Sequence, residues 1–121
     1  MIVESINPAL PFWTEKMGFQ KTAVFPEEGE PAFAMLIKGD EEIMFQTRES
    51  STSEHPILKP YVSSGTILQY IDVDSLDAVL SKVPKDSILV PPKDTFYGTR
   101  EAVVKDPSGF LLIFAEKKNK A

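Results

Sequence analysis

Residues 97–114 read Tyr-Gly-Thr-Arg-Glu-Ala-Val-Val-Lys-Asp-Pro-Ser-Gly-Phe-Leu-Leu-Ile-Phe, which is the pattern of a β-hairpin. The two flanks are rich in β-branched and aromatic residues, which favour strands. Between them, Pro107 fixes the φ angle of a turn and Gly109 can adopt a positive φ. The sequence therefore predicts two antiparallel strands joined by a tight turn at residues 106–109.

The composition indicates one globular domain. The chain has 121 residues, 42% of them apolar and 10% aromatic, and no cysteine, so a disulfide, a thiolate nucleophile and a thiolate metal site are excluded. The net charge of −5 disfavours nucleic acid as a partner. No apolar run approaches the roughly 18 residues of a membrane span, and no signal peptide is visible, so we expect no membrane partner and a cytoplasmic location.

The first half of the chain shows a strand, a helix and three further strands. Residues 1–6 are β-like, and Asn7 and Pro8 are suited to cap and begin a helix that ends at Gly18. Trp13 follows the helical spacing of apolar residues and is predicted to lie between helix and sheet. A strand at 19–25 and a hairpin of 32–38 with 42–48 around Gly39 complete this half.

The second half repeats this order about 66 residues later. Residues 66–72 form the strand, and Asp74 is expected to cap a helix with Asp77 at its third position. The apolar residues of that helix form one stripe, composed of Leu76, Val79, Leu80 and Val83. A short strand at 87–90 before Pro91 precedes the hairpin of 97–114. The fold class is therefore α+β, with two βαβββ modules.

We predict a single domain over residues 1–121, with module 1 at about 1–48, a connector at 49–65, module 2 at about 66–117 and a basic tail at 118–121. The connector is rich in Ser and Pro and is predicted to cross the surface, with a lid over a pocket as the alternative. Lys117, Lys118 and Lys120 indicate a solvated end.

Three motifs together resemble the vicinal oxygen chelate superfamily, the group of glyoxalases, bleomycin-resistance proteins and extradiol dioxygenases. Residues 12–19 (Phe-Trp-Thr-Glu-Lys-Met-Gly-Phe) are similar to its aromatic pair, short helix and Leu-Gly-Phe. Residues 105–110 (Lys-Asp-Pro-Ser-Gly-Phe) resemble its Arg-Asp-Pro-Asp-Gly-Asn hairpin, with Tyr97-Gly98 matching the aromatic-Gly before it. Residues 71–78 (Ile-Asp-Val-Asp-Ser-Leu-Asp-Ala) look like its Val-Asp-Asp-Val-Asp-Ala helix entry.

The resemblance implies two βαβββ modules whose mixed sheets curl around a cavity, usually in a homodimer. Metal-dependent members hold a divalent cation there with four His, Glu or Gln ligands from the first and last strands of each module. On this pattern the first position falls before Met1, which leaves open a longer N-terminus. The others fall on Met44, Thr66 and Ile113, none of which suits a hard cation. We therefore expect no metal, no cofactor and no catalytic residue of the usual kind.

Strand alternation extends these positions to a candidate ligand site. Gln46 and Arg48 share the face of Met44, and Leu68 and Tyr70 share that of Thr66. With Leu111, Ile113 and Ala115 they form an apolar surface with a few polar groups, as in small-molecule sites. Tyr97 and Arg100 are predicted at the pocket mouth, with a surface salt bridge as the alternative for Arg100. A collapsed cavity, in which these residues are core, is the alternative to the site as a whole.

The sequence favours a metal-free member of this superfamily that binds or sequesters a small, partly apolar ligand in a dimeric cavity, as bleomycin-resistance proteins do. An enzyme is the second hypothesis. Under this hypothesis the protein would be a glyoxalase-related lyase, an isomerase or a dioxygenase-type enzyme. Such an enzyme would hold a metal through Glu4, Glu49 or His55, or would use Tyr70 or Arg48 without one. His55 by itself is predicted to be solvent-exposed and inert. The third hypothesis is a regulatory or partner-binding dimer module with a vestigial cavity.

Overall fold

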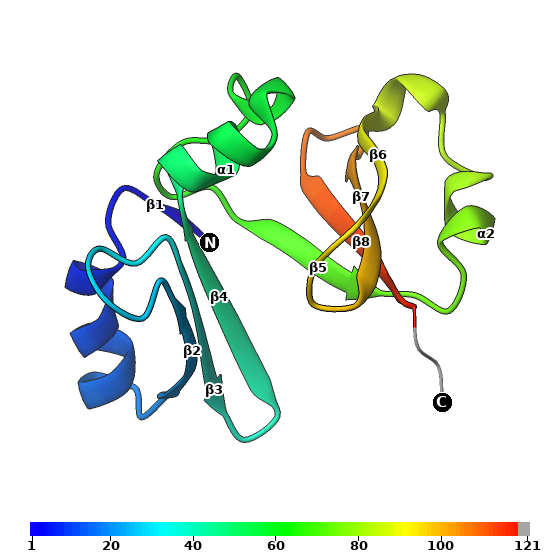
Figure 1. The fold of residues 1–121 in the computed structure, drawn as a ribbon. Coiled ribbons are helices and arrows are strands. Elements are labelled where there is room, and N and C mark those ends of the chain that lie inside the picture. The colour runs from blue at the N-terminus through cyan, green and yellow to red at the C-terminus, as the bar shows by residue number, and fades with distance from the viewer. Residues whose placement is uncertain (119–121) are drawn as a thin grey trace. The chain divides into compact units, whose positions relative to one another are not determined.

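The structure is a computed structural model, and it describes residues 1–118. The chain divides into two compact units, Met1–Thr66 and a second unit that begins at Ile67. Each unit contains a four-stranded mixed sheet and short helices (Figure 1). Among residues 1–118, no helix has the length and apolar character needed to cross a membrane.

The sheet of the first unit has the order β1-β4-β3-β2. β1 (Ile2–Val3) pairs in parallel with β4 (Glu41–Thr47), and β4 pairs antiparallel with β3 (Phe33–Lys38). β2 (Gln20–Phe25) forms the other edge, antiparallel to β3. The predicted hairpin around Gly39 is confirmed, and Gly39 has a φ of 58°. The first strand is much shorter than the predicted 1–6.

The sheet of the second unit has the corresponding order, β5-β8-β7-β6. β5 (Leu68–Asp72) pairs in parallel with β8 (Leu111–Lys117), and β8 pairs antiparallel with β7 (Thr99–Lys105). The edge strand β6 (Ile88–Asp94) runs through both prolines with irregular register, which an edge strand tolerates because its outer N–H groups need no partner. The predicted repeat of the two modules is confirmed by this shared strand order.

Two short turns precede β2 and cover one face of the first sheet. These are the 3₁₀ turn η1 (Asn7–Ala9) and the π-helical turn η2 (Phe12–Lys16). Trp13 makes edge-to-face contacts with Phe19 and Phe45 at centroid distances of 5.4 and 6.2 Å, so its predicted place in the core is confirmed. Asn7 lies inside the first turn and its side chain does not cap it, because Ile6 is already in helical conformation.

The helix of the second unit, α2 (Leu76–Leu80), contacts β7 and β8. Its cap is Ser75 rather than the predicted Asp74, since Ser75 Oγ accepts a 3.1 Å bond from Ala78 N. Glu116 on β8 satisfies another free amide by accepting from Leu76 N at 2.7 Å. Leu76 is fully buried, whereas Val79, Leu80 and Val83 are half-buried. The 3₁₀ turn η4 (Lys85–Ser87) follows.

The predicted connector is largely helical. Its elements are α1 (Arg48–Glu54) and the 3₁₀ turn η3 (Pro56–Leu58). Thr47 begins α1 as its cap, because its Oγ1 accepts a 3.1 Å bond from Ser50 N. The Ser-rich composition hid this helix, since Ser is a weak helix former away from a cap.

The hairpin of 97–114 forms as predicted. The Asp106 carboxylate accepts bonds from Ser108 N at 2.9 Å and Phe110 N at 2.8 Å, and Gly109 has a φ of 93°. Beyond the hairpin, Lys117 and Lys118 are both exposed, as we expected of a solvated end, although Lys117 ends β8 and Lys118 Nζ lies 3.1 Å from Asp94 Oδ2. Lys120 lies outside the described residues.

Candidate functional site

The two faces of the second sheet carry different chemistry. Arg100 on β7 and Glu116 on β8 reach α2, where they contact Asp77 Oδ1 at 3.4 Å and Leu76 N at 2.7 Å. Because side chains alternate along a strand, Glu101 and Ala115 face the other side. Glu101 and Ala115 are register partners. Ile113 lies two residues before Ala115 on β8, and its register partner on β5 is Tyr70. The face opposite α2 therefore joins Tyr70, Glu101 and Ile113.

Three hydroxyl groups converge on one oxygen of the Glu101 carboxylate on that face. Thr99 Oγ1 donates to Glu101 Oε2 at 2.7 Å and the Tyr97 hydroxyl donates at 2.9 Å. The Tyr70 hydroxyl donates to the same oxygen. Thr95 Oγ1 extends the network to Thr99 Oγ1 at 2.7 Å. We call Tyr70, Tyr97, Thr99 and Glu101 the hydroxyl–carboxylate cluster.

The cluster depends on a small residue in the intervening strand. β8 lies between β5 and β7, so the Tyr70 side chain crosses it to reach Glu101. The residue opposite Glu101 in the register is Ala115, which is 1% exposed. A methyl side chain leaves room for the tyrosine ring, whereas a larger residue would compete for that space.

Burial of Tyr70 raises the pKa of its hydroxyl above its ordinary value, and the hydrogen bond to Glu101 and the charge of that carboxylate raise this pKa further. The hydroxyl therefore keeps its proton at neutral pH and acts as a hydrogen-bond donor. It is not suited to abstract a proton, because a general base needs a pKa near the working pH.

Most of the ligand-site residues predicted in the second unit lie on the face opposite α2, whereas Arg100 lies on the face toward α2. Leu68 and Tyr70 lie half-buried on β5, and Ile113 is half-buried on β8 in register with Tyr70. Tyr97 is brought to Tyr70 through their shared bond to Glu101. Arg100 faces α2 and pairs with Asp77, which is the alternative that the sequence left open for it.

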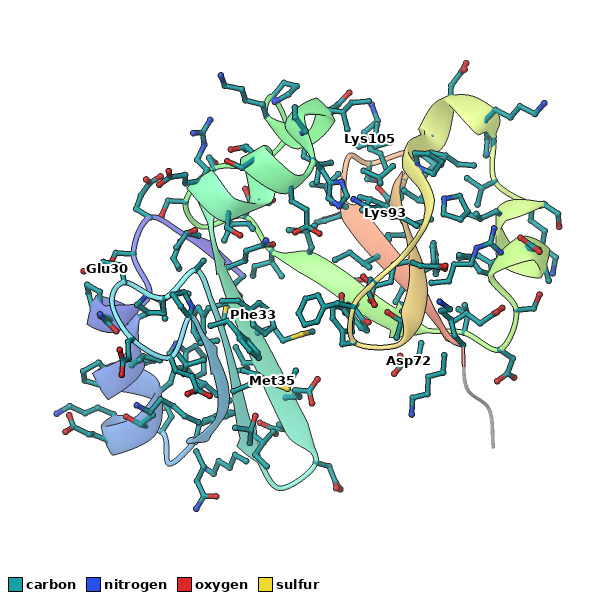
Figure 2. All side chains as sticks on the ribbon, viewed as in Figure 1. Glu30, Phe33, Met35, Asp72, Lys93 and Lys105 are labelled. Carbon is teal, nitrogen blue, oxygen red and sulfur yellow. The ribbon has the colours of Figure 1, made fainter. Side chains whose placement is uncertain are left out.

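In the first unit, Met44 and Gln46 share a face of β4, opposite the face that carries the core residue Phe45. The register places Met44 beside Met35 and Gln46 beside Phe33. Figure 2 shows Phe33 and Met35 pointing away from the N-terminal turns. The Gln46 amide donates to Ser50 Oγ at 3.0 Å and to Glu54 Oε2 at 3.4 Å, and thereby joins β4 to α1.

Two predicted residues lie outside the strands on which we expected them. Arg48 is the first residue of α1, so strand alternation does not apply to it, and its Nε donates to the carbonyl of Val62 at 3.2 Å. Thr66 precedes β5, and its Oγ1 accepts a 3.0 Å bond from Ser63 N within a turn. Thr47 and Gly65 explain these differences, since the Thr47 cap begins a helix early and Gly65 extends a turn with a φ of 94°.

The residues that the resemblance aligned with the family's metal positions do not suit a hard divalent cation. Met44, Thr66 and Ile113 offer a thioether, a hydroxyl and an alkyl group, whereas hard divalent cations prefer carboxylate or imidazole ligands. Over residues 1–118, no group of three or more His, Asp or Glu side chains is arranged to hold a metal, which includes Glu4, Glu49 and His55. His55 is half-buried rather than exposed, and its Nε2 lies 3.5 Å from Glu54 Oε1.

A groove of about 570 Å³ lies in the first unit. Its lining is polar and acidic, and none of the predicted ligand-site residues belongs to it. The lining residues are Glu4, Ser5, Glu30, Pro31, Ala32, Thr47, Glu49, Ser50 and Ser53.

Sequence reasoning missed Glu101 and Thr99, which are central to the cluster. The signal was the alternation Tyr97-x-Thr99-x-Glu101, which places three hydrogen-bonding groups at every second position. The apolar run Ala102-Val103-Val104 hid the parity of this strand, because all three residues are buried. A strand that is buried on both faces gives no alternating pattern.

Comparison with known proteins identifies a family. The family model described as Glyoxalase/Bleomycin resistance protein/Dioxygenase superfamily matches residues 1–114. No curated protein is significantly similar to the chain.

Solved structures share the fold at low sequence identity. A glyoxalase/bleomycin resistance protein/dioxygenase superfamily member from Vibrio splendidus 12B01 is 21% identical, with 97% of this chain and 94% of that chain covered and a TM-score of 0.73. A hypothetical protein from Bacillus halodurans C-125 is 23% identical, with coverages of 99% and 91% and a TM-score of 0.67.

Proposed function

The chain belongs to the glyoxalase/bleomycin resistance protein/dioxygenase superfamily, and we propose that it binds a small, partly apolar ligand without a metal ion. The ligand binds on the face of the second sheet that carries Tyr70, Glu101 and Ile113. We further propose that the protein acts as a homodimer, whose cavity encloses this face.

The observation that carries the proposal is the hydroxyl–carboxylate cluster. Small-molecule sites combine an apolar wall with a few polar groups that orient the ligand. Leu68 and Ile113 supply apolar surface on this face, and Glu101 supplies an acceptor that Thr99 holds in place at 2.7 Å. A carboxylate held by hydroxyl donors presents a fixed position to a ligand, which lowers the entropy cost of binding.

Two features favour binding over catalysis by the groups that we considered. The raised pKa of Tyr70 makes its hydroxyl a donor rather than a base. The Arg48 Nε is engaged by the carbonyl of Val62 at 3.2 Å. Metal-assisted catalysis at the family's positions would require ligands in place of Met44, Thr66 and Ile113.

A thermal-shift screen of the full chain, treated with EDTA, tests the proposal. A ligand that binds the native state must raise the melting temperature, and we expect hits among small aromatic and cationic compounds. The shift should be smaller in Glu101→Gln and unchanged in Arg100→Met. Arg100 is the matched control because it neighbours Glu101 on β7 but faces α2. Hits that depend on Arg100 and not on Glu101, or no hit at all, would contradict the proposal.

A further inference from the structure

We infer that the ligand is an organic cation, a protonated amine with an apolar body, and that its ammonium group binds the Glu101 carboxylate. This inference rests on the proposed function, because it names the ligand class of the same site. Its basis is the distribution of donors and charges around Glu101.

The three hydroxyl donors use only one of the two carboxylate oxygens. The Tyr70, Tyr97 and Thr99 hydroxyls all donate to Oε2. Among the hydrogen bonds within residues 1–118, none reaches Oε1 of Glu101. An ionised carboxylate has acceptor sites on both oxygens, so Oε1 keeps its capacity for a further donor.

This carboxylate forms no ion pair within residues 1–118, although Lys93 on β6 is its register partner and shares its face of the sheet. Ion pairs within residues 1–118 include His55 with Glu54, Arg100 with Asp77, and Lys118 with Asp94, and Glu101 takes part in none of these. Its donors are hydroxyl groups, which carry dipoles but no formal charge. A partly buried anion that is held by hydroxyl groups and forms no ion pair is favourable for a positively charged ligand, which gains both a hydrogen bond and a Coulomb attraction.

The surroundings of Glu101 also restrict the rest of the ligand. Leu68 and Ile113 lie on the same face and favour an alkyl or aromatic body. An anionic ligand would be repelled by Glu101 at close range and by the net charge of −5 at longer range. A neutral alcohol can donate one hydrogen bond to Oε1 but lacks the charge, so we expect it to bind more weakly than an amine of the same shape.

Three probes of one shape and different charge test the inference: 2-phenylethylamine, 2-phenylethanol and 3-phenylpropionate. Each is titrated into the EDTA-treated, ¹⁵N-labelled full chain and followed by two-dimensional NMR, with dissociation constants from isothermal titration calorimetry. We expect the amine to bind about tenfold more tightly than the alcohol, which corresponds to about 1.4 kcal/mol. Its shifts should be centred on the amides of Tyr70, Thr99 and Glu101, and the propionate should not bind.

Two variants separate the charge of Glu101 from other effects. Glu101→Gln keeps the shape and an acceptor oxygen, and it should remove the preference for the amine while binding of the alcohol persists. Glu41→Gln makes the same change at an exposed position on β4 and should keep the preference. The amine and the alcohol binding equally at Tyr70 and Glu101, or the propionate binding most tightly, would overturn the cation inference and leave the proposed function standing. No shift in these amides with any probe would contradict both.

Discussion

Removal of the Tyr70 hydroxyl tests the hydroxyl–carboxylate cluster directly. Tyr70→Phe keeps the ring across β8 and deletes only the bond to Glu101 Oε2. A hydrogen bond to a charged group contributes about 1.5–3 kcal/mol to the free energy of unfolding. We expect the lower end, about 1.5 kcal/mol, because Oε2 keeps its donors from Thr99 at 2.7 Å and Tyr97 at 2.9 Å.

Urea unfolding followed by circular dichroism measures this loss. With a slope of about 1.5 kcal/mol per M, the midpoint of Tyr70→Phe should fall by about 1 M at unchanged slope. Tyr97→Phe removes a bond to the same oxygen, but Tyr97 is 56% exposed, so its cost should be smaller, about 0.5 kcal/mol.

A double-mutant cycle with Glu101→Gln determines whether the cost belongs to the charged bond. In the Gln background the acceptor is neutral, and Tyr70→Phe should cost about 0.5–1 kcal/mol, which leaves a coupling of about 0.5–1 kcal/mol. Equal costs in the two backgrounds, or a cost in the wild type below about 0.3 kcal/mol, would refute the reasoning that Glu101 and Tyr70 act together.

Three further predictions concern pH, core packing and the hydrogen bonds of the hairpin turn. The folded chain holds the Tyr70 proton to higher pH than the unfolded chain, so the free energy of unfolding should fall as the pH rises above about 10. Urea unfolding at several pH values should show a smaller decrease of this free energy with pH in Tyr70→Phe than in the wild type. Leu76→Ala leaves a cavity at a fully buried position between α2 and the sheet, so urea unfolding should show a loss of about 2–5 kcal/mol in the free energy of unfolding. The control Ala78→Ser, at an exposed position of the same helix, should change this free energy by less than about 0.5 kcal/mol. Asp106→Ala deletes the acceptor of two backbone bonds in the hairpin and should cost about 1–2 kcal/mol, with Ser108→Ala near neutral; equal effects of the two changes would contradict this account of the turn.

The succession of strands and helices along the chain was predictable because turn chemistry and periodicity agreed in most segments. Gly39 and Gly109 mark their hairpins, with φ angles of 58° and 93°, and the spacing around Trp13 placed this residue in the core. The caps were harder to predict, since Asp74 and Ser75 are both good caps and only tertiary contacts select between them. The helix α1 was missed because its capping by Thr47 outweighs the weak helix propensity of its serines.

The candidate site was only partly predictable. Tyr70 was found from strand alternation and Ile113 from the family resemblance, and the register places them side by side. Glu101 was missed because the buried run after it conceals which face it occupies. Arg48 was misplaced because alternation was extended past Thr47, where the backbone changes from strand to helix. Patterns in a sequence give the period of an element, but the point at which the period changes depends on caps and packing.

The proposal that this protein binds its ligand without a metal is tested most directly by calorimetric titration of 2-phenylethylamine into the EDTA-treated full chain, alone and after addition of equimolar zinc, nickel or manganese. Elemental analysis accompanies each titration. We predict dissociation constants that agree within about twofold in all four conditions, and no stoichiometric metal after dialysis. One tightly held metal ion per chain, with the probe binding only when that ion is present, would contradict the account.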